Sequence, residues 1–254
     1  MDHYIPYIKR KIILKAGESS ERKEDYIAVE KKLNITLNEK CIISLFCTPS
    51  QIKELITGLL FTGGISDGEI SPDILNISYG DEINVDIAAK NIPMKNLNVS
   101  RHLGGFTFTK DRISKPITDR LSVSFKVIKG LFDKFQQKSE LFRLTGCFHS
   151  AALADTEKIL AFAEDIGRHN AVDKVIGSIL LQDIPFFEKI MLVSCRLSSE
   201  IVLKCSHLNI SILASRAAPT DLAIKIAEES RITLIGFMRD NRFNIYTHNH
   251  RVIL

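Results

Sequence analysis

Residues 121–254 alternate short apolar runs with segments of helical periodicity, and this alternation limits the possible folds more than any other feature. The expected elements are strands at 159–163, 189–193, 210–214 and 232–237, with helices at 127–135, 170–180, 198–207 and 219–229. Consecutive strands that are joined by helices run parallel, because the helix carries the chain back to the starting edge. We therefore expect an α/β unit with a largely parallel sheet and helices on both faces.

The first 120 residues are expected to be mostly strand. Apolar and polar residues alternate at 33–37 and 83–87, which is the period of a half-buried strand, and 41–46 and 74–78 are further short candidates. The chain is thus expected to divide into a smaller β-rich unit at 1–120 and an α/β unit at 121–254.

One helix is expected among these strands. Thr48 is the expected N-cap, Pro49 takes the first helical position, and Gln51 completes a capping-box pattern. Gly63–Gly64 ends the helix. Between them lies an apolar stripe at helical spacing, formed by Ile52, Leu55, Ile56, Leu59 and Leu60.

A basic loop is expected between the two units, at about 98–120. This stretch is dense in Ser, Thr, Arg and Lys around Gly104–Gly105. Between Lys95 and Arg143 there are 11 basic and 4 acidic residues, whereas the whole chain has a net charge of only +4. The uneven charge suggests an anionic partner, and a solvated surface is the simpler alternative.

Several classes of protein lose support. The longest apolar run, Ile159–Ala163, is far too short for a membrane span, and the N-terminus has no signal pattern. The histidines and the five cysteines, at 41, 47, 147, 195 and 205, show no metal-binding spacing, so we expect reduced thiols, a cytoplasmic protein and no metal site. The sequence also lacks the serine-hydrolase elbow, the Walker loop and the Rossmann glycine motif.

Arginines follow all four strands that are expected in the second half. They are Arg168, Arg196, Arg216, Arg239 and Arg242. Ligands of open α/β sheets bind beyond the carboxyl ends of the strands, where helix N-termini and arginines hold phosphates. A pocket for a multiply phosphorylated ligand is expected there, and unrelated surface arginines are the alternative. His169 is a candidate phosphate ligand or proton shuttle, whereas His149 is expected to be structural.

Six strings together resemble the formate dehydrogenase accessory family FdhD/NarQ. The longest of them is Glu164–Lys174, which contains Gly-Arg-His-Asn-Ala-Val-Asp-Lys. The others are Thr48–Pro49, Gly58–Phe61, Ala218–Thr220, Leu234–Phe237 and Tyr246–His248, so the resemblance covers nearly the whole chain.

The resemblance implies a cytidine-deaminase-like, three-layer αβα domain preceded by a smaller β-rich domain, assembled as a homodimer. It also implies a sulfurtransferase that accepts sulfur from a cysteine desulfurase as a persulfide. The sulfur passes to the molybdenum cofactor, bis-molybdopterin guanine dinucleotide, which formate dehydrogenase needs. The segment implied to contact this cofactor is Phe237, Met238, Arg239, Asp240, Asn241 and Arg242. A guanine nucleotide would then act as a mimic of the cofactor.

The sequence departs from the family at the expected persulfide site. The family carries its persulfide on a Cys-x-x-Cys loop, and the matching segment, Asn98–Phe106, has Arg101 and Gly104 at the thiol positions. Cys147 and Cys195 stand where the resemblance implies glycine. Cys195 is the preferred replacement because Arg196 would stabilise its thiolate, although desolvation would oppose this.

Four functions remain open, and the catalytic residues are unknown. A sulfur carrier for the molybdenum cofactor is the first, and a non-catalytic binder that chaperones the cofactor is the second. A deaminase-like nucleotide enzyme rests on analogy of fold alone. An RNA-binding surface lacks an aromatic platform, so we expect neither nucleic acid nor membrane as a partner.

Overall fold

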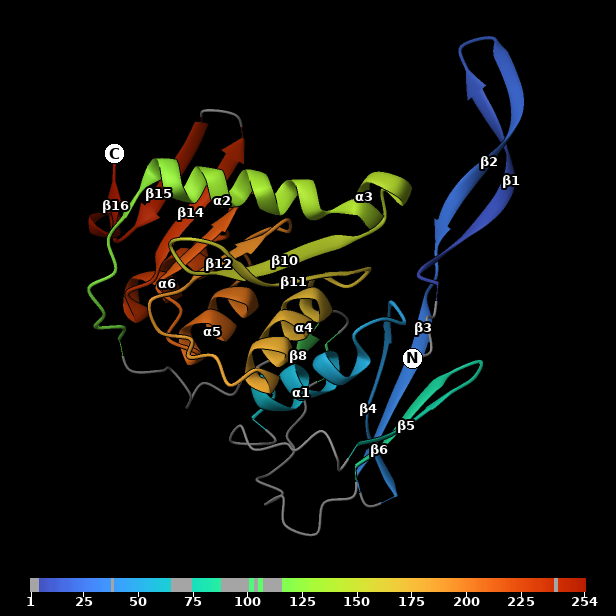
Figure 1. The fold of residues 1–254 in the computed structure, drawn as a ribbon, viewed down its shortest axis with the longest axis horizontal. Helices are drawn as coiled ribbons and strands as arrows, with labels where there is room; N and C mark the ends of the chain where they lie inside the picture. The colour runs from blue at the N-terminus through green and yellow to red at the C-terminus, as the bar shows by residue number, and fades with distance from the viewer. Residues whose placement is uncertain are drawn as a thin grey trace.

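A six-stranded mixed sheet forms the larger part of the protein (Figure 1). The computed structural model describes residues 5–37, 39–64, 75–87, 101–102, 105–106, 116–239 and 242–254. In spatial order the strands are β11 (Ile159–Asp165), β10 (His149–Ala154), β12 (Ile190–Val193), β13 (Ile212–Ser215), β14 (Thr233–Arg239) and β15 (Arg242–Thr247). The four strands expected from the sequence are all present, as β11, β12, β13 and β14.

The expectation of a largely parallel sheet is wrong. Only β12–β13 and β13–β14 pair in parallel, whereas β10 and β15 run against their neighbours. These two strands were not expected as strands, and each pairs with its neighbour in the chain, as in a hairpin. Because β10 is antiparallel to both β11 and β12, the four expected strands still point the same way, and their carboxyl ends share one edge.

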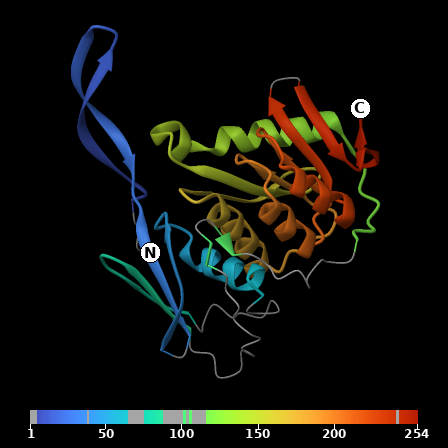
Figure 2. The ribbon, with the colours of Figure 1, turned by 180° about the vertical axis from the view of Figure 1, so that it is seen from behind.

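Helices cover both faces of this sheet, as expected (Figures 1 and 2). The helices α4 (Arg168–Leu181), α5 (Ser199–His207) and α6 (Asp221–Ser230) lie on one face, and α2 (Phe125–Lys138) lies on the other. Successive residues of each strand serve opposite faces. In β10, Ala151 and Leu153 pack towards α4, whereas Ala152 and Ala154 pack towards α2. The likeness to cytidine deaminases stays a prediction.

A smaller sheet holds the first part of the chain, with the order β4-β3-β6-β5. Its strands are β3 (Lys31–Leu37), β4 (Lys40–Cys47), β5 (Leu75–Tyr79) and β6 (Ile83–Ile87), which confirms the four strands expected there. The helix α1 (Ile52–Thr62) packs its apolar stripe on this sheet. Its other side faces α4, so α1 lies between the two sheets.

Two glycines let α1 and α4 meet at their backbones. A Cβ added to Gly58 would lie 1.9 Å from the carbonyl oxygen of Asp173, and one on Gly177 would lie 1.8 Å from that of Glu54. Real Cβ atoms do not come so close to an oxygen. The two helices therefore cross with no side chain between them at this point.

The expected N-cap of α1 is wrong. The helix begins at Ile52, and Gln51 stands at the N-cap in a left-handed conformation with φ 50° and no side-chain cap. Thr48 instead donates its N–H to Asp165 Oδ2 at 3.0 Å and accepts at Oγ1 from the Ile166 N–H at 3.1 Å. The Thr48 hydroxyl is thus used in a contact with the end of β11 and does not cap α1. The expected end of the helix at Gly63 is confirmed.

A long hairpin extends away from both sheets (Figures 1 and 2). Its strands, β1 (Tyr7–Ala16) and β2 (Ser19–Ala28), pair antiparallel over their full length, and Gly17 turns the chain with φ +58°. Most of its side chains are exposed. The sequence therefore lacks the alternation of apolar and polar residues that predicts a half-buried strand.

Short elements complete the described chain. They are the pair β7 (Arg101–His102) and β8 (Gly105–Phe106), the pair β9 (Val123–Ser124) and β16 (Val252–Ile253), α3 (Glu140–Thr145), and the 3-10 turn Asn249–Arg251. Most of the expected loop at 98–120, including Gly104, lies outside the described residues. The division at residue 120 stays a prediction. No helix in the described part of the chain is long and apolar enough to cross a membrane.

Candidate functional site

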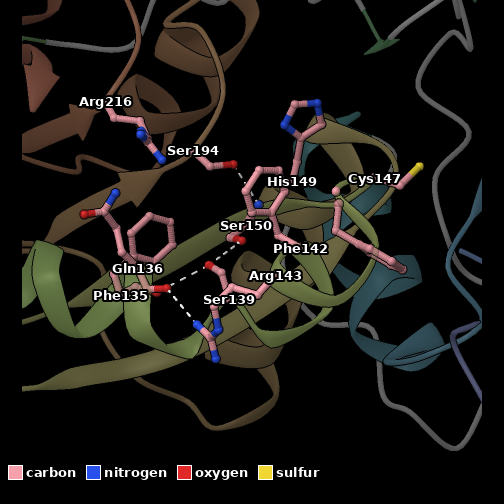
Figure 3. A pocket seen from close by; sticks show the side chains of 12 residues that line it. Phe135, Gln136, Ser139, Phe142, Arg143, Cys147, His149, Ser150, Ser194 and Arg216 are labelled. Carbon is pink, nitrogen blue, oxygen red and sulfur yellow. Dashed lines mark hydrogen bonds between the residues drawn. The ribbon is translucent and has the colours of Figure 1, made fainter. Parts of the chain in front are cut away.

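A pocket of about 330 Å³ opens at the sheet edge where β12 and β13 end (Figure 3). The strand ends supply Ser194 and Arg216, and the start of β10 supplies His149 and Ser150. The segment from α2 to β10 supplies the rest of the lining: Phe135, Gln136, Ser139, Phe142, Arg143, Gly146, Cys147 and Phe148. This is the edge at which the sequence predicts a ligand.

Hydrogen bonds between serines join the elements around the pocket. Ser150 donates its N–H to Ser194 Oγ at 2.9 Å, and the Ser194 N–H donates to the carbonyl oxygen of Ser150 at 3.0 Å. The hydroxyls of Ser139 and Ser150 lie 2.7 Å apart (Figure 3). The start of β10, the end of β12 and the end of α2 are thus held together, which gives the pocket a fixed wall.

The short helix α3 brings Cys147 to this pocket. The Glu164 carboxylate accepts from the N–H groups of Leu141 and Phe142 at 3.0 and 2.9 Å, and so it caps the helix from β11. At the other end, Gly146 has φ 71°, a left-handed conformation that ends the helix and that glycine adopts readily. The thiol that follows is exposed.

The charged groups of the lining are all basic. Arg143 and Arg216 contribute guanidinium groups, and no Asp or Glu is among the lining residues. Partial burial, followed by the positive charge of Arg168, lowers the pKa of His149, so this ring is neutral at pH 7. The pocket is therefore suited to an anionic ligand.

Three of the expected arginines gather at one end of this edge. Arg239 Nε donates to the carbonyl oxygen of Arg216 at 3.3 Å, and the Arg242 guanidinium lies 5.6 Å from the centre of the Phe237 ring. Phe237 has φ 53° at an irregularity in the β14–β15 pairing, and its N–H donates to Ala217. Of these residues, only Arg216 lines the pocket.

The remaining members of the segment expected to contact the cofactor differ. The Met238 side chain is only 1% exposed and packs in the core beneath α2, so it does not offer a surface to a ligand. Asp240 and Asn241 lie outside the described residues. A role of Phe237–Arg242 in cofactor binding stays a prediction.

Arg168, His169 and Arg196 do not line the pocket. His169 is 7% exposed, and burial, with the charges of Lys204 and Arg168, lowers its pKa to about 3. Its Nε2 lies 2.9 Å from Oε2 of Glu200, but neither ring nitrogen makes a hydrogen bond. At pH 7 the ring is therefore neutral. Its role as phosphate ligand or proton shuttle stays a prediction.

Cys195, the preferred sulfur-carrying residue, lies in the core. Its side chain is 5% exposed, and burial raises its pKa to about 11 although Arg168 and Arg196 oppose this. Desolvation thus decides the balance that the sequence left open. Burial also raises the pKa of Cys47, to about 12, and that of Cys205. Cys41 and Cys147 are the exposed thiols.

The string Glu164–Lys174 joins the two sheets instead of lining the pocket. Asp165 accepts at Oδ1 from the N–H of Gly167 and from Asn170 Nδ2, and its Oδ2 lies 2.6 Å from Lys174 Nζ. Lys174 also donates to the carbonyl oxygen of Thr48 at 3.1 Å.

A second buried ion pair lies next to the first, because Asp173 directly precedes Lys174 on α4. Asp173 accepts hydrogen bonds from Lys204 Nζ at 2.5 Å and from the hydroxyl of Thr62, at the end of α1, at 2.9 Å. Among the described residues, no cluster of His, Cys, Asp and Glu could hold a metal ion.

Comparisons with known proteins cover both sheets. The model of the FdhD/NarQ family matches residues 28–253. A sulfur carrier protein FdhD from Bacillus pumilus is 36% identical over 259 residues, which covers 97% of this chain and 98% of the relative. The protein of the same name from Saccharolobus solfataricus is 38% identical, with 96% and 98% covered.

A solved structure shows the same fold. It is that of a candidate formate dehydrogenase accessory protein from Desulfotalea psychrophila, with a TM-score of 0.79 and 27% identity. The match covers 98% of this chain and 100% of that one. The small sheet and the main sheet thus belong to one shared architecture.

Proposed function

Because this chain belongs to the FdhD/NarQ family, we propose that it is a sulfur carrier for the molybdenum cofactor. It accepts sulfur from a cysteine desulfurase as a persulfide and delivers it to bis-molybdopterin guanine dinucleotide, which formate dehydrogenase then uses. The relatives named as sulfur carriers, which match nearly the whole chain, support this proposal. The cofactor is the cargo of this reaction, and a guanine nucleotide is its mimic.

The basic pocket is the observation that carries the proposal. Arg216 and Arg143 line it, and Arg239 Nε donates a hydrogen bond to the carbonyl oxygen of Arg216. Guanidinium groups bind phosphate oxygens through paired hydrogen bonds, and a dinucleotide cofactor carries several phosphates. A ligand bound at Arg216 would extend from the pocket towards Arg239 and Arg242 along the sheet edge.

Other parts of the proposal rest on the family. The protein acts in the cytoplasm as a homodimer, and its partners are the desulfurase and formate dehydrogenase instead of nucleic acid or membrane. The larger unit, with its sheet between two helical layers, is of the cytidine-deaminase type.

Calorimetry with GDP tests the pocket. We expect wild type to bind GDP and both Arg216→Ala and Arg239→Ala to bind it more weakly, by about tenfold to a hundredfold each, because a charge-assisted hydrogen bond is lost. Arg22→Ala is the matched control, since Arg22 is exposed on β2 and does not line the pocket. Equal affinity for GDP in all four proteins would contradict nucleotide binding at this sheet edge.

A non-catalytic cofactor binder is the second candidate. The observation that favours it is the loop Asn98–Phe106, which has no cysteine and carries Arg101 and Gly104 at the expected thiol positions. Such a protein would bind GDP as above but would never acquire sulfur from a desulfurase. Persulfide labelling of the wild-type protein therefore separates the two functions.

A further inference from the structure

The exposure of the five thiols limits which of them can take sulfur. A thiol that takes sulfur from another protein must be reachable, and it must ionise to attack. Cys47, Cys195 and Cys205 are 0, 5 and 0% exposed, and burial raises the pKa of each. The structure therefore leaves Cys41 and Cys147, which are exposed.

Position separates these two thiols. Cys41 lies on β4 in the small sheet, where its Sγ is 3.6 Å from the carbonyl oxygen of Ile43. Cys41 is not among the residues that line the pocket. Cys147 lines the pocket itself. Only Cys147 can pass an atom to a ligand held there.

The surroundings of Cys147 suit an anionic sulfur acceptor. The residue shares the lining with Arg143, Arg216 and the neutral ring of His149, and no carboxylate lines the pocket. A phosphorylated ligand that these guanidinium groups bind would therefore lie beside Cys147. Cys147 is thus one of several groups of a built pocket and differs from an isolated surface cysteine.

The orientation of Cys147 suits a carrier. In Figure 3 its sulfur points away from the other lining side chains, where another protein can reach it. Cysteine has a single side-chain torsion that sets the sulfur position, with three staggered states. A rotation about the Cα–Cβ bond can therefore move the sulfur between the outside and the pocket, while Gly146 and the capped α3 hold the backbone in place.

We propose that Cys147 is the sulfur-accepting residue of this chain and takes the place of the missing loop cysteines. This inference rests on the proposed function. The Cys147 thiolate attacks the outer sulfur of a cysteine persulfide on the desulfurase. A new S–S bond forms at Cys147, the S–S bond of the donor breaks, and its electron pair leaves with the donor cysteine as a thiolate. One sulfur atom moves and no net oxidation occurs, so no further reactant is needed.

Persulfide mapping tests the proposal. The full-length protein is incubated with a cysteine desulfurase and L-cysteine, alkylated, digested and mapped by mass for peptides that carry one extra sulfur. Wild type is compared with Cys147→Ser, and Cys41→Ser and Cys195→Ser are the matched controls. Circular dichroism and thermal unfolding of each variant show that it is folded, and GDP affinity is measured for wild type.

The outcomes separate this proposal from the proposed function. We expect the extra sulfur on Cys147 in wild type, a loss of at least tenfold in Cys147→Ser, and no loss in either control. Labelling that persists in folded Cys147→Ser would overturn the assignment and leave the sulfur carrier intact. Wild-type protein that binds GDP but is never labelled would overturn both, and it would identify a cofactor binder.

Discussion

At the scale of single residues, two glycines set the distance between α1 and α4. We expect Gly58→Ala to lower the free energy of unfolding by about 2 kcal/mol or more, because its methyl group would clash with the backbone carbonyl of Asp173, which cannot rotate away. Urea unfolding followed by circular dichroism measures the effect.

Gly130 supplies the matched control for this substitution. It lies inside α2, and a Cβ added there meets nothing within 4 Å. Gly130→Ala should raise stability by about 0.5–1 kcal/mol, because alanine loses less backbone entropy in a helix. Equal effects of the two substitutions would show that α1 and α4 do not meet as closely as described.

The reactivity of the thiols follows from their burial. With a pKa of about 11, Cys195 is ionised in roughly one molecule in a thousand at pH 8, and its sulfur is also shielded. We expect iodoacetamide at pH 8 to modify Cys41 and Cys147 in the native protein and to spare Cys47, Cys195 and Cys205. A higher pH increases the thiolate fraction but does not uncover the sulfur.

Peptide mapping by mass spectrometry reads this pattern. The same reaction in about 8 M urea, a concentration at which most domains are unfolded, should modify all five thiols. Rapid native modification of Cys195 would contradict its buried position and would restore it as a sulfur-carrying candidate.

At the scale of elements, a buried ion pair joins β11 to α4, and both partners also form hydrogen bonds with Thr48 before α1. Lys174 and Asp165 are each fully buried, 2.6 Å apart. We expect Lys174→Met to destabilise the protein by about 3–5 kcal/mol, because it leaves an uncompensated carboxylate in the core. Chemical denaturation of both proteins gives the difference.

An exposed ion pair provides the comparison. Lys129 and Asp133 lie 2.6 Å apart on the surface of α2, at i and i+4. Lys129→Met should cost about 0.5 kcal/mol or less, since water screens such pairs. If the two lysine variants lose the same stability, the buried pair does not hold the two elements together.

Much of the element pattern could be predicted from the sequence, because burial repeats along it. The strands at 33–37 and 83–87 and the helix after Pro49 follow from periodicity alone. The pairing direction does not, because it is set by β10 and β15, which were not expected as strands and which run antiparallel to the expected strands beside them. The N-cap failed because Thr48 forms hydrogen bonds with residues more than 100 positions away.

The site was predicted only in part. Strand order placed Arg216 and Arg239 at one sheet edge, where the structure brings them together. The contribution of α3 was missed, because a six-residue helix capped by the Glu164 side chain leaves no periodic signal. Cys147 was considered, but Cys195 was preferred to it. The string Glu164–Lys174 looked like a site but joins two elements, and nothing in its residue types separates these two roles.

At the scale of the whole molecule, we expect a homodimer. The hairpin of β1 and β2 extends from the body and exposes Ile13 at 70%, and such apolar side chains gain from burial against another chain. Light scattering coupled to size exclusion should give twice the mass of one 28.6 kDa chain at micromolar concentration. A mass of one chain at every concentration would refute this expectation.

The contact between α1 and α4 can form only after the ribosome has synthesised both helices. Thr62 and Asp173, which bond across it, are 111 residues apart. At a synthesis rate of roughly 5–20 residues per second, α1 leaves the ribosome about 6–22 seconds before its partner does. During that interval the glycine-bearing side of α1 faces solvent instead of α4. The uncovered side of α1 on such a nascent chain is a surface that a chaperone can bind until α4 emerges.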